Sequence, residues 1–77
     1  MSIAINTGYI KHYNSNRGFG FIVYHKPGEE YKQQIYFHAN ECLTGFTPEL
    51  NKRVQFDIML NKDGKPMAVE VQDEIKS

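Results

Sequence analysis

Residues 17–24 read RGFGFIVY, and the direction in which their side chains point decides how the rest of the chain folds. Successive side chains of a β-strand point to opposite faces, so Phe19 and Phe21 share one face while Gly20 and Ile22 share the other. Both faces cannot be buried against one core. We therefore expect Ile22 to point inward with Gly20 beside it, and both phenylalanine rings to lie on the outer surface.

The next predicted strand, residues 33–38, indicates the same arrangement. Ile35 and Phe37 are its natural core pair, so Tyr36 and His38 face outward beside the two phenylalanines. Exposed apolar area is unfavourable by about 25 cal/mol per Å² relative to buried area, so four outward rings indicate a partner that covers them. Unpaired bases stack on such rings at about 1–3 kcal/mol each. The pattern predicts a surface for single-stranded nucleic acid, although some of these rings could instead fill the core.

Three other segments have the two-residue period of half-buried strands, at residues 7–13, 54–60 and 67–71. The last two are joined by residues 61–66, whose Asp-Gly pair is typical of a tight hairpin turn. The residues expected to face the core in this hairpin are Val54, Phe56, Ile58, Leu60, Met67, Val69 and Val71. Five short strands predict an all-β, five-stranded antiparallel OB-type barrel, because an open sheet would leave two unpaired edges.

The 77 residues are expected to form one domain, 1–77, with its core at about 7–72. Nine basic and nine acidic residues balance, so no overall field draws the chain to duplex DNA or to an anionic membrane. We find no signal peptide and no apolar run of 18 residues, and Cys42 has no second cysteine to pair with. These features predict a cytoplasmic monomer without a membrane association. A helical turn is expected only near 40–43, with Asn40 as its cap.

The stretch 17–24 also fits the RNP1 pattern K/R-G-F/Y-G/A-F-V-x-F/Y at every place except Ile22. Gly18 and Gly20 are expected to leave space between the rings, so that a base can approach and lie flat. Only 16 residues precede the motif, too few for the strand, helix and second strand that an RNA-recognition motif places before RNP1. That fold is therefore excluded.

The order and spacing of these motifs resemble the cold-shock domain, a five-stranded OB-fold barrel with RNP-like motifs on its second and third strands. The likeness runs from about residue 8 to 71: GYIKHYN at 8–14 resembles G-x-V-K-W-F-N, RGFGFI at 17–22 resembles K-G-F-G-F-I, and IYFH at 35–38 resembles V-F-V-H. It implies binding of single-stranded RNA or DNA, and a role as an RNA chaperone or cold-shock regulator. The nucleic-acid-binding residues that follow are Lys11, His12, Tyr13, Arg17, Phe19, Phe21, Tyr36, His38 and Phe46, the last as a loop aromatic that caps the ring surface.

Two departures from the family pattern reduce the expected affinity. His12 stands in the tryptophan place, and Ala39 stands where a phenylalanine usually follows the histidine. At about 1–3 kcal/mol per stacked base, losing two rings weakens binding by one or more orders of magnitude. Tyr13 could replace part of the lost surface if a bulge near Asn14 brings both it and His12 outward. An OB-type barrel whose face binds a protein partner is the alternative, favoured by the neutral charge and by these two replacements.

Three cations lie close in sequence to the rings, namely Lys11, Arg17 and Lys26. Contacts to about three phosphates give a log–log salt slope of roughly −2 for a single strand. Because this slope is shallow, we expect stacking to dominate and an affinity of about 1 μM to survive moderate salt. The segment 23–34 either is a mobile loop or extends this surface with Tyr24, His25, Lys26 and Tyr31.

The remaining polar residues do not predict catalysis or a bound group. The three histidines show no ligand spacing with one another or with Cys42, so no metal and no cofactor is expected. Cys42 follows Glu41 and has no activating cation beside it, which favours an inert thiol. A barrel this small fills its interior with side chains and has no pocket for a reaction. The sequence therefore does not predict an enzyme.

Overall fold

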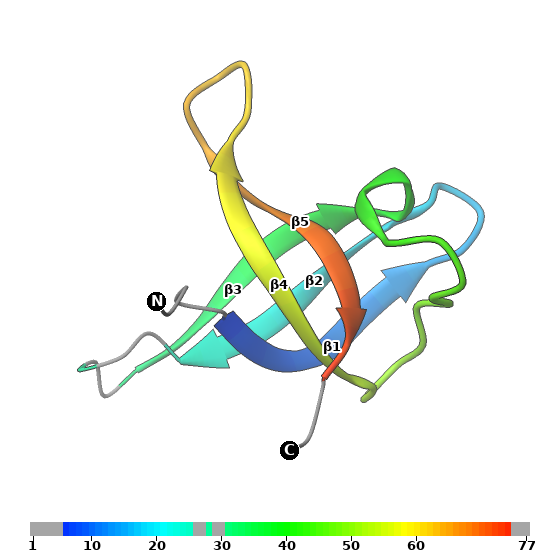
Figure 1. The fold of residues 1–77 in the computed structure, drawn as a ribbon. Helices are drawn as coiled ribbons and strands as arrows, with labels where there is room; N and C mark the ends of the chain where they lie inside the picture. Colours follow the sequence, from blue (N-terminus) through cyan, green and yellow to red (C-terminus); the bar gives the residue numbers. More distant parts are fainter. Residues whose placement is uncertain (1–5, 26–27, 29–30, 75–77) are drawn as a thin grey trace.

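A computed structural model describes residues 6–25, 28 and 31–74, which form a closed barrel of five strands (Figure 1). The elements in chain order are β1 (Asn6–Asn14), β2 (Phe19–His25), β3 (Lys32–His38), the 3-10 helix η1 (Ala39–Glu41), β4 (Arg53–Leu60) and β5 (Pro66–Asp73). Around the barrel the order is β1-β2-β3-β5-β4, antiparallel throughout except for the parallel pair β3 and β5. The predicted five-stranded barrel is confirmed. In the described part of the chain no helix has the length and apolar character needed to cross a membrane.

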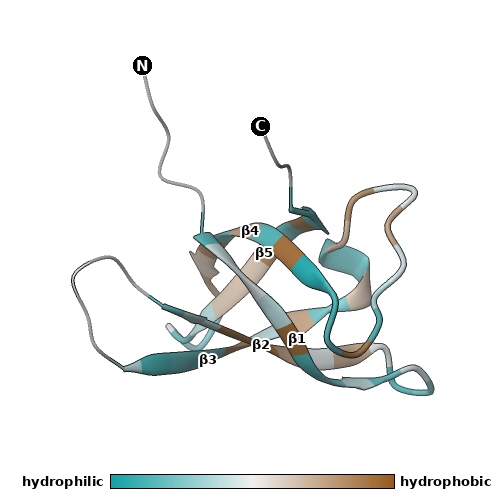
Figure 2. Ribbon diagram, turned by 90° about the horizontal axis from the view of Figure 1, so that it is seen from below, coloured by the Kyte–Doolittle hydropathy of each residue, from teal (hydrophilic) through white to brown (hydrophobic). Residues whose placement is uncertain are grey.

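Apolar side chains from all five strands fill the barrel. Ile22 and Phe37 have no exposed surface, and Ile35 is buried between them and the other strands. The inward residues predicted for β2 and β3 are therefore confirmed. Figure 2 shows apolar and polar residues interleaved along the strands, as expected where only one face of a sheet is buried.

Tyr24 belongs to this core. Its ring is 4% exposed and meets Phe56 edge-on, with 5.3 Å between the ring centroids. Within the segment 23–34, residues 23–25 belong to β2 and residues 32–34 to β3, whereas 26, 27, 29 and 30 lie outside the described residues. The proposal that Tyr24 extends an outer surface is therefore wrong. His25 and Tyr31 are exposed, whereas Lys26 lies outside the described residues.

The predicted hairpin between β4 and β5 is present and extends beyond the barrel in Figure 1. Asn61 organises its turn, because the Asn61 N–H donates to the Lys65 carbonyl at 2.8 Å. The Asn61 Oδ1 also accepts from the N–H groups of Asp63 and Lys65, at 2.8 and 3.0 Å. Gly64 takes the left-handed φ of 78° that the tight reversal requires.

The prediction of which hairpin side chains face the core is wrong at several positions. In β5 the side chains without exposed surface are Ala68 and Val71, three positions apart rather than two. Glu70 lies between them with a φ of 52°, and this irregularity shifts the alternation by one residue. In β4, Gln55 is buried while Leu60, beyond the end of the barrel, is 67% exposed.

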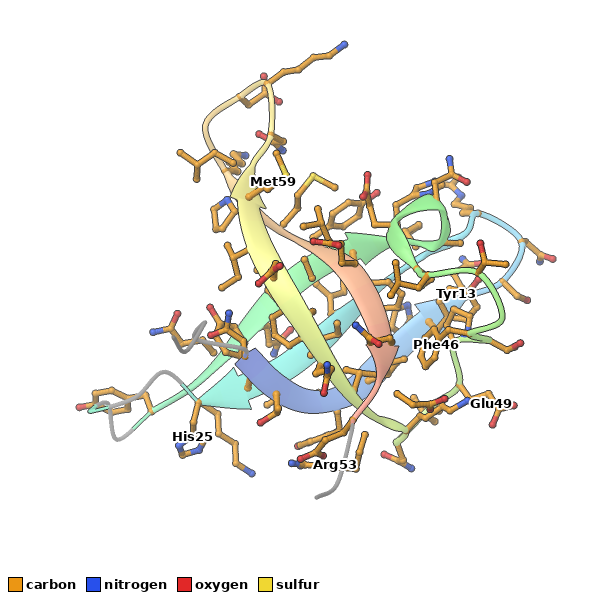
Figure 3. The ribbon with its side chains drawn as sticks, in the orientation of Figure 1. Tyr13, His25, Phe46, Glu49, Arg53 and Met59 are labelled. Atoms are coloured by element: carbon orange, nitrogen blue, oxygen red, sulfur yellow. The ribbon has the colours of Figure 1, made fainter. Side chains whose placement is uncertain are left out.

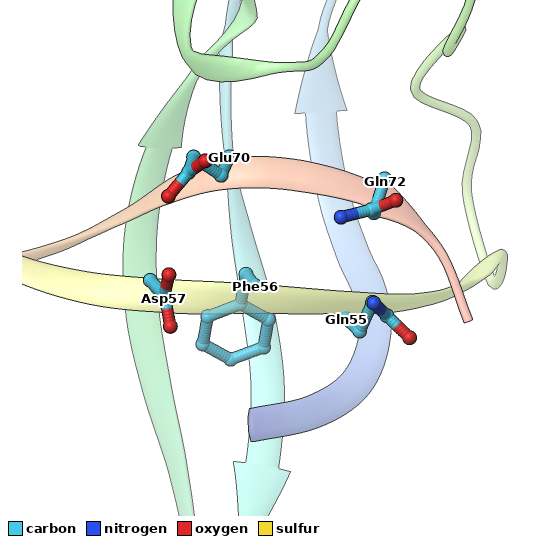
Figure 4. A pocket seen from close by; sticks show the side chains of 5 residues that line it. All are labelled: Gln55, Phe56, Asp57, Glu70 and Gln72. Atoms are coloured by element: carbon cyan, nitrogen blue, oxygen red, sulfur yellow. The ribbon is translucent and has the colours of Figure 1, made fainter. Parts of the chain in front are cut away.

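A shallow hollow opens at this irregularity. Figure 4 shows its lining, with Asp57 on β4 and Glu70 on β5 among the labelled side chains. The register between the two strands shifts between Gln55 and Asp57, opposite this part of β5. The hollow is therefore a local consequence of the bulged pairing.

Candidate nucleic-acid interface

Three aromatic rings gather on the outer face of β2 and β3. Phe19 and Tyr36 stack, with ring centroids 5.9 Å apart and planes inclined by 27°. Phe21 meets both of them edge-on, at 6.4 Å from Phe19 and 6.1 Å from Tyr36. All three rings are half-buried, since each covers part of the next and keeps part of its surface in solvent. Phe19, Phe21 and Tyr36 are called the aromatic platform below.

The pairing of β2 with β3 sets the outward direction of the platform. Phe21 lies opposite Tyr36, and Ile22 lies opposite Ile35. Residues directly opposite one another share a face of the sheet, and the two isoleucines are buried. The platform therefore occupies the outer face, in agreement with the predicted facing. Mutual packing of the rings lowers the unfavourable free energy of leaving them exposed.

A β-bulge brings His12 to the platform. The register of β1 against β2 shifts between Ile10 and His12, so that Lys11 is the additional residue and His12 lies opposite Phe21. The two ring centroids are 6.3 Å apart. Lys11 and His12 are both exposed. Strict alternation would have turned His12 inward with Ile10, and the bulge that prevents this lies at Lys11 rather than near Asn14.

Tyr13 turns in the opposite direction. It lies opposite Gly20 and stacks on Phe37, with centroids 5.9 Å apart and planes inclined by 11°. Its half-buried ring packs against the core. The expectation that the bulge brings both His12 and Tyr13 outward is wrong for Tyr13, because alternation resumes after one additional residue. The Tyr13 ring is therefore not part of the platform.

The two glycines of the motif allow close packing of the barrel and a left-handed backbone conformation. A Cβ on Gly20 would collide with the carbonyl oxygen of His12 and come within 2.9 Å of the Phe37 ring. Gly20 thus faces the barrel interior, and the space it provides does not lie between the platform rings. Gly18 has a left-handed φ of 73° in the turn between β1 and β2. For Gly20, the predicted space between the rings is wrong, because the residue packs against the barrel interior. For Gly18, the turn requires the left-handed φ, and access for a base stays a prediction.

His38 ends β3 beside Phe19 and caps the helical turn that follows. Its Nδ1 accepts a hydrogen bond from the Asn40 N–H at 3.0 Å. The turn covers Ala39–Glu41 instead of 40–43, and the predicted cap at Asn40 is wrong. Because Nδ1 accepts, a neutral His38 ring carries its hydrogen on Nε2.

Phe46 lies in the segment between η1 and β4. Its ring packs against the core, and the Lys52 Nζ lies 4.7 Å from the ring centroid. Lys52 also donates to the Thr47 carbonyl at 3.2 Å and pairs with Asp73 at 3.5 Å. Figure 3 shows Phe46 on the same side of the barrel as Tyr13. The structure thus places Phe46 at the edge of the core, and its role as a cap on the platform stays a prediction.

Two exposed cations flank the platform. Lys11 is the bulged residue of β1, and Arg17 lies in the turn before Phe19. The Asn14 side chain shapes this turn, since its Oδ1 accepts from the N–H groups of Asn16 and Arg17 at 3.0 and 3.2 Å. Lys11 therefore lies on β1, the strand that pairs with β2, and Arg17 lies two residues before Phe19. The third predicted cation, Lys26, lies outside the described residues.

Cys42 is held in its protonated form. Burial, and secondarily the neighbouring Glu41 carboxylate, raise the pKa of the thiol from 9.0 to about 11. A thiol is a nucleophile only as its thiolate, so this group is unreactive near neutral pH. Across residues 6–25, 28 and 31–74, no three His, Cys, Asp or Glu side chains come together as a metal site.

Comparison with known proteins agrees with this geometry. The profile of the 'Cold-shock' DNA-binding domain matches residues 6–74, from the start of β1 to the residue after β5. No curated protein matches the sequence. The match includes the whole platform, the histidines His12 and His38, and the cations Lys11 and Arg17. Domains of this kind bind nucleic acid, and the chain belongs to the cold-shock domain family.

Proposed function

We propose that the protein binds single-stranded RNA or DNA by stacking unpaired bases on the aromatic platform. The observation that carries this proposal is the packing of Phe19, Phe21 and Tyr36 within 6.4 Å of one another on an outer surface, each with part of its ring in solvent. Stacking on such rings contributes about 1–3 kcal/mol per base and tolerates any base, since every base has a flat face. A duplex keeps its bases stacked inside and cannot use this surface.

Side chains around the platform supply the polar contacts. His12 lies beside Phe21 and adds a smaller stacking surface at one edge. His38 presents its Nε2–H as a donor for a base acceptor, because its Nδ1 is engaged by the backbone. Lys11 and Arg17 contact phosphates, and two such contacts give a log–log salt slope of about −1.4. Stacking therefore dominates, and the expected affinity is about 1 μM.

Tyr13 and Phe46 have a supporting role in this proposal. Tyr13 stacks on Phe37 and so fixes the barrel wall behind the platform. Phe46 holds the segment before β4 against the core through its contact with Lys52. Both rings are half-buried at the barrel edge, where a longer strand would touch their exposed parts.

An RNA chaperone role follows from the same binding mode. A domain that binds only unpaired bases stabilises the open form of an RNA hairpin and shifts its equilibrium toward that form. Neither a catalytic step nor a cofactor is needed for this activity. We propose that the protein acts as a monomeric single domain in the cytoplasm, where the unpaired Cys42 stays reduced.

The proposal is tested by removing single platform rings. Phe19→Ala and Tyr36→Ala should each weaken binding of a pyrimidine-rich single strand at least fivefold, the effect of about 1 kcal/mol per stacked base. Circular dichroism should show that the barrel stays folded. Leu50→Ala is the control, since it removes a 61% exposed apolar side chain from outside the platform. Unaltered binding in both ring variants refutes the proposal and favours the alternative, a face that binds a protein partner.

A further inference from the structure

A second concave surface lies beyond the platform, where β2 ends and β3 begins. It is lined by residues of β1, β2 and β3 and by Arg53 at the start of β4, and it opens to solvent. Figure 3 shows two of its lining residues, His25 and Arg53, on one side of the barrel. No motif in the sequence predicts this surface, because its residues come from separate strands. It is called the basic hollow below.

The basic hollow lies farther along β2 from the platform, and its lining includes the buried Tyr24 as well as outward-facing residues. Phe21 and His25 are four residues apart on β2, so both face outward, about 13 Å apart at 3.3 Å per residue. Val23 lies between them in the lining of the hollow, opposite Tyr9 of β1. His25 lies opposite Lys32 of β3. A strand that continues along β2 past Phe21 crosses Val23, which is 5% exposed, and then reaches the basic hollow.

Two cations flank one aromatic ring in the basic hollow. The Lys32 Nζ lies 5.8 Å from the centroid of the Tyr9 ring, and Arg53 lies opposite Tyr9 across the β1–β4 pair. The Arg53 Nε donates to Glu74 at 3.0 Å, and the Arg53 side chain is 55% exposed. This ion pair engages Nε, whereas the Nη groups of a guanidinium also bind phosphate oxygens. Among the described residues named here, Lys32, Arg53 and Glu74 leave one unit of positive charge, on a chain of zero net charge.

We infer that the basic hollow binds the backbone phosphates of a nucleic-acid strand that extends past the platform. Lys32 and Arg53 each donate to a phosphate oxygen, and the Tyr9 ring supports the sugar or base between them. The inference rests on the proposed function, because the platform fixes the position of the strand. A strand long enough to reach the hollow gains these contacts, and a shorter one does not.

The test compares two oligothymidylates, of about 4 and about 10 nucleotides, which lie within the site sizes of OB folds. The variant replaces both cations, Lys32→Gln with Arg53→Gln. With the longer strand its log–log salt slope should be shallower than that of the unmodified protein by about 1.4, for two phosphates at about 0.7 each. The affinity ratio of the two proteins then changes about sevenfold between about 50 and 200 mM salt. Binding of the shorter strand should be the same for both proteins.

Two additional measurements do not depend on the double variant. Glu74→Gln removes the carboxylate that competes for Arg53, so it should tighten binding of the longer strand and leave the shorter one unaffected. In the unmodified protein, the NMR signals of the Tyr9 ring should move with the longer strand only.

The outcomes separate this inference from the proposed function. Equal salt slopes for the double variant and the unmodified protein, with the Tyr9 ring unmoved by the longer strand, overturn the phosphate site and leave the platform intact. If the unmodified protein binds neither strand, the proposed function and the inference fall together. A shallower slope seen only with the longer strand supports the inference.

Discussion

Replacing Gly20 by alanine should destabilise the barrel without altering the chemistry of the platform. The added Cβ would collide with the His12 carbonyl oxygen and lie 2.9 Å from the ring of Phe37, which has no exposed surface. Overpacking of this kind costs about 1–3 kcal/mol, and the upper end applies because the obstructing oxygen belongs to the backbone. A chain of 77 residues has a total stability of about 4–12 kcal/mol, so the loss is a large part of it.

Urea unfolding followed by circular dichroism measures this loss. With a urea dependence of about 1–2 kcal/mol per M, the midpoint should fall by roughly 2 M. Gly64→Ala is the matched control, because nothing lies within 4 Å of its added methyl group and only left-handed strain of about 1 kcal/mol remains. A Gly20→Ala protein that keeps its midpoint but loses affinity for single strands would refute the packing explanation. That result would instead support the role of Gly20 that the sequence predicts, which is to leave space for a base.

Three other predictions separate binding from structural roles. His12→Trp places a larger ring beside Phe21 and should tighten binding of a pyrimidine strand about tenfold, as measured by fluorescence titration. An unchanged affinity would mean that no base reaches this position. Tyr13→Ala removes the ring stacked on Phe37 and should lower the free energy of unfolding by about 3 kcal/mol, and a wild-type melting temperature would contradict this. The alkylation rate of Cys42 should rise with an inflection near pH 11, and an inflection near pH 9 would show that its pKa is not raised. Since the folded thiol keeps its proton to higher pH than the unfolded chain, the stabilisation it gives is complete below pH 9.0 and is lost as pH rises through about 11.

The outward rings of β2 and β3 could be predicted because each strand offers only one good core pair. Ile35 and Phe37 are both buried, which leaves Tyr36 on the other face. This reasoning needs only unbroken alternation. It succeeds here because β2 and β3 pair without a register shift from Phe19 to His25.

Alternation fails wherever one residue is inserted into a strand. The bulge at Lys11 reverses the facing of His12 and Tyr13, and the left-handed Glu70 does the same to the end of β5. Neither position is a glycine, so the sequence carries no local signal for the irregularity. The basic hollow was missed for a different reason: Tyr9, Lys32 and Arg53 become neighbours only when β1 pairs with β4 and the sheet closes.

The central claim is tested most directly by an NMR titration of the labelled protein with a short pyrimidine-rich single strand, run beside the matching duplex. We expect the ring signals of Phe19, Phe21, Tyr36 and His38 to shift together with the single strand and to stay in place with the duplex. Signals that remain unmoved by the single strand, or that move equally with the duplex, would contradict stacking of unpaired bases on the platform.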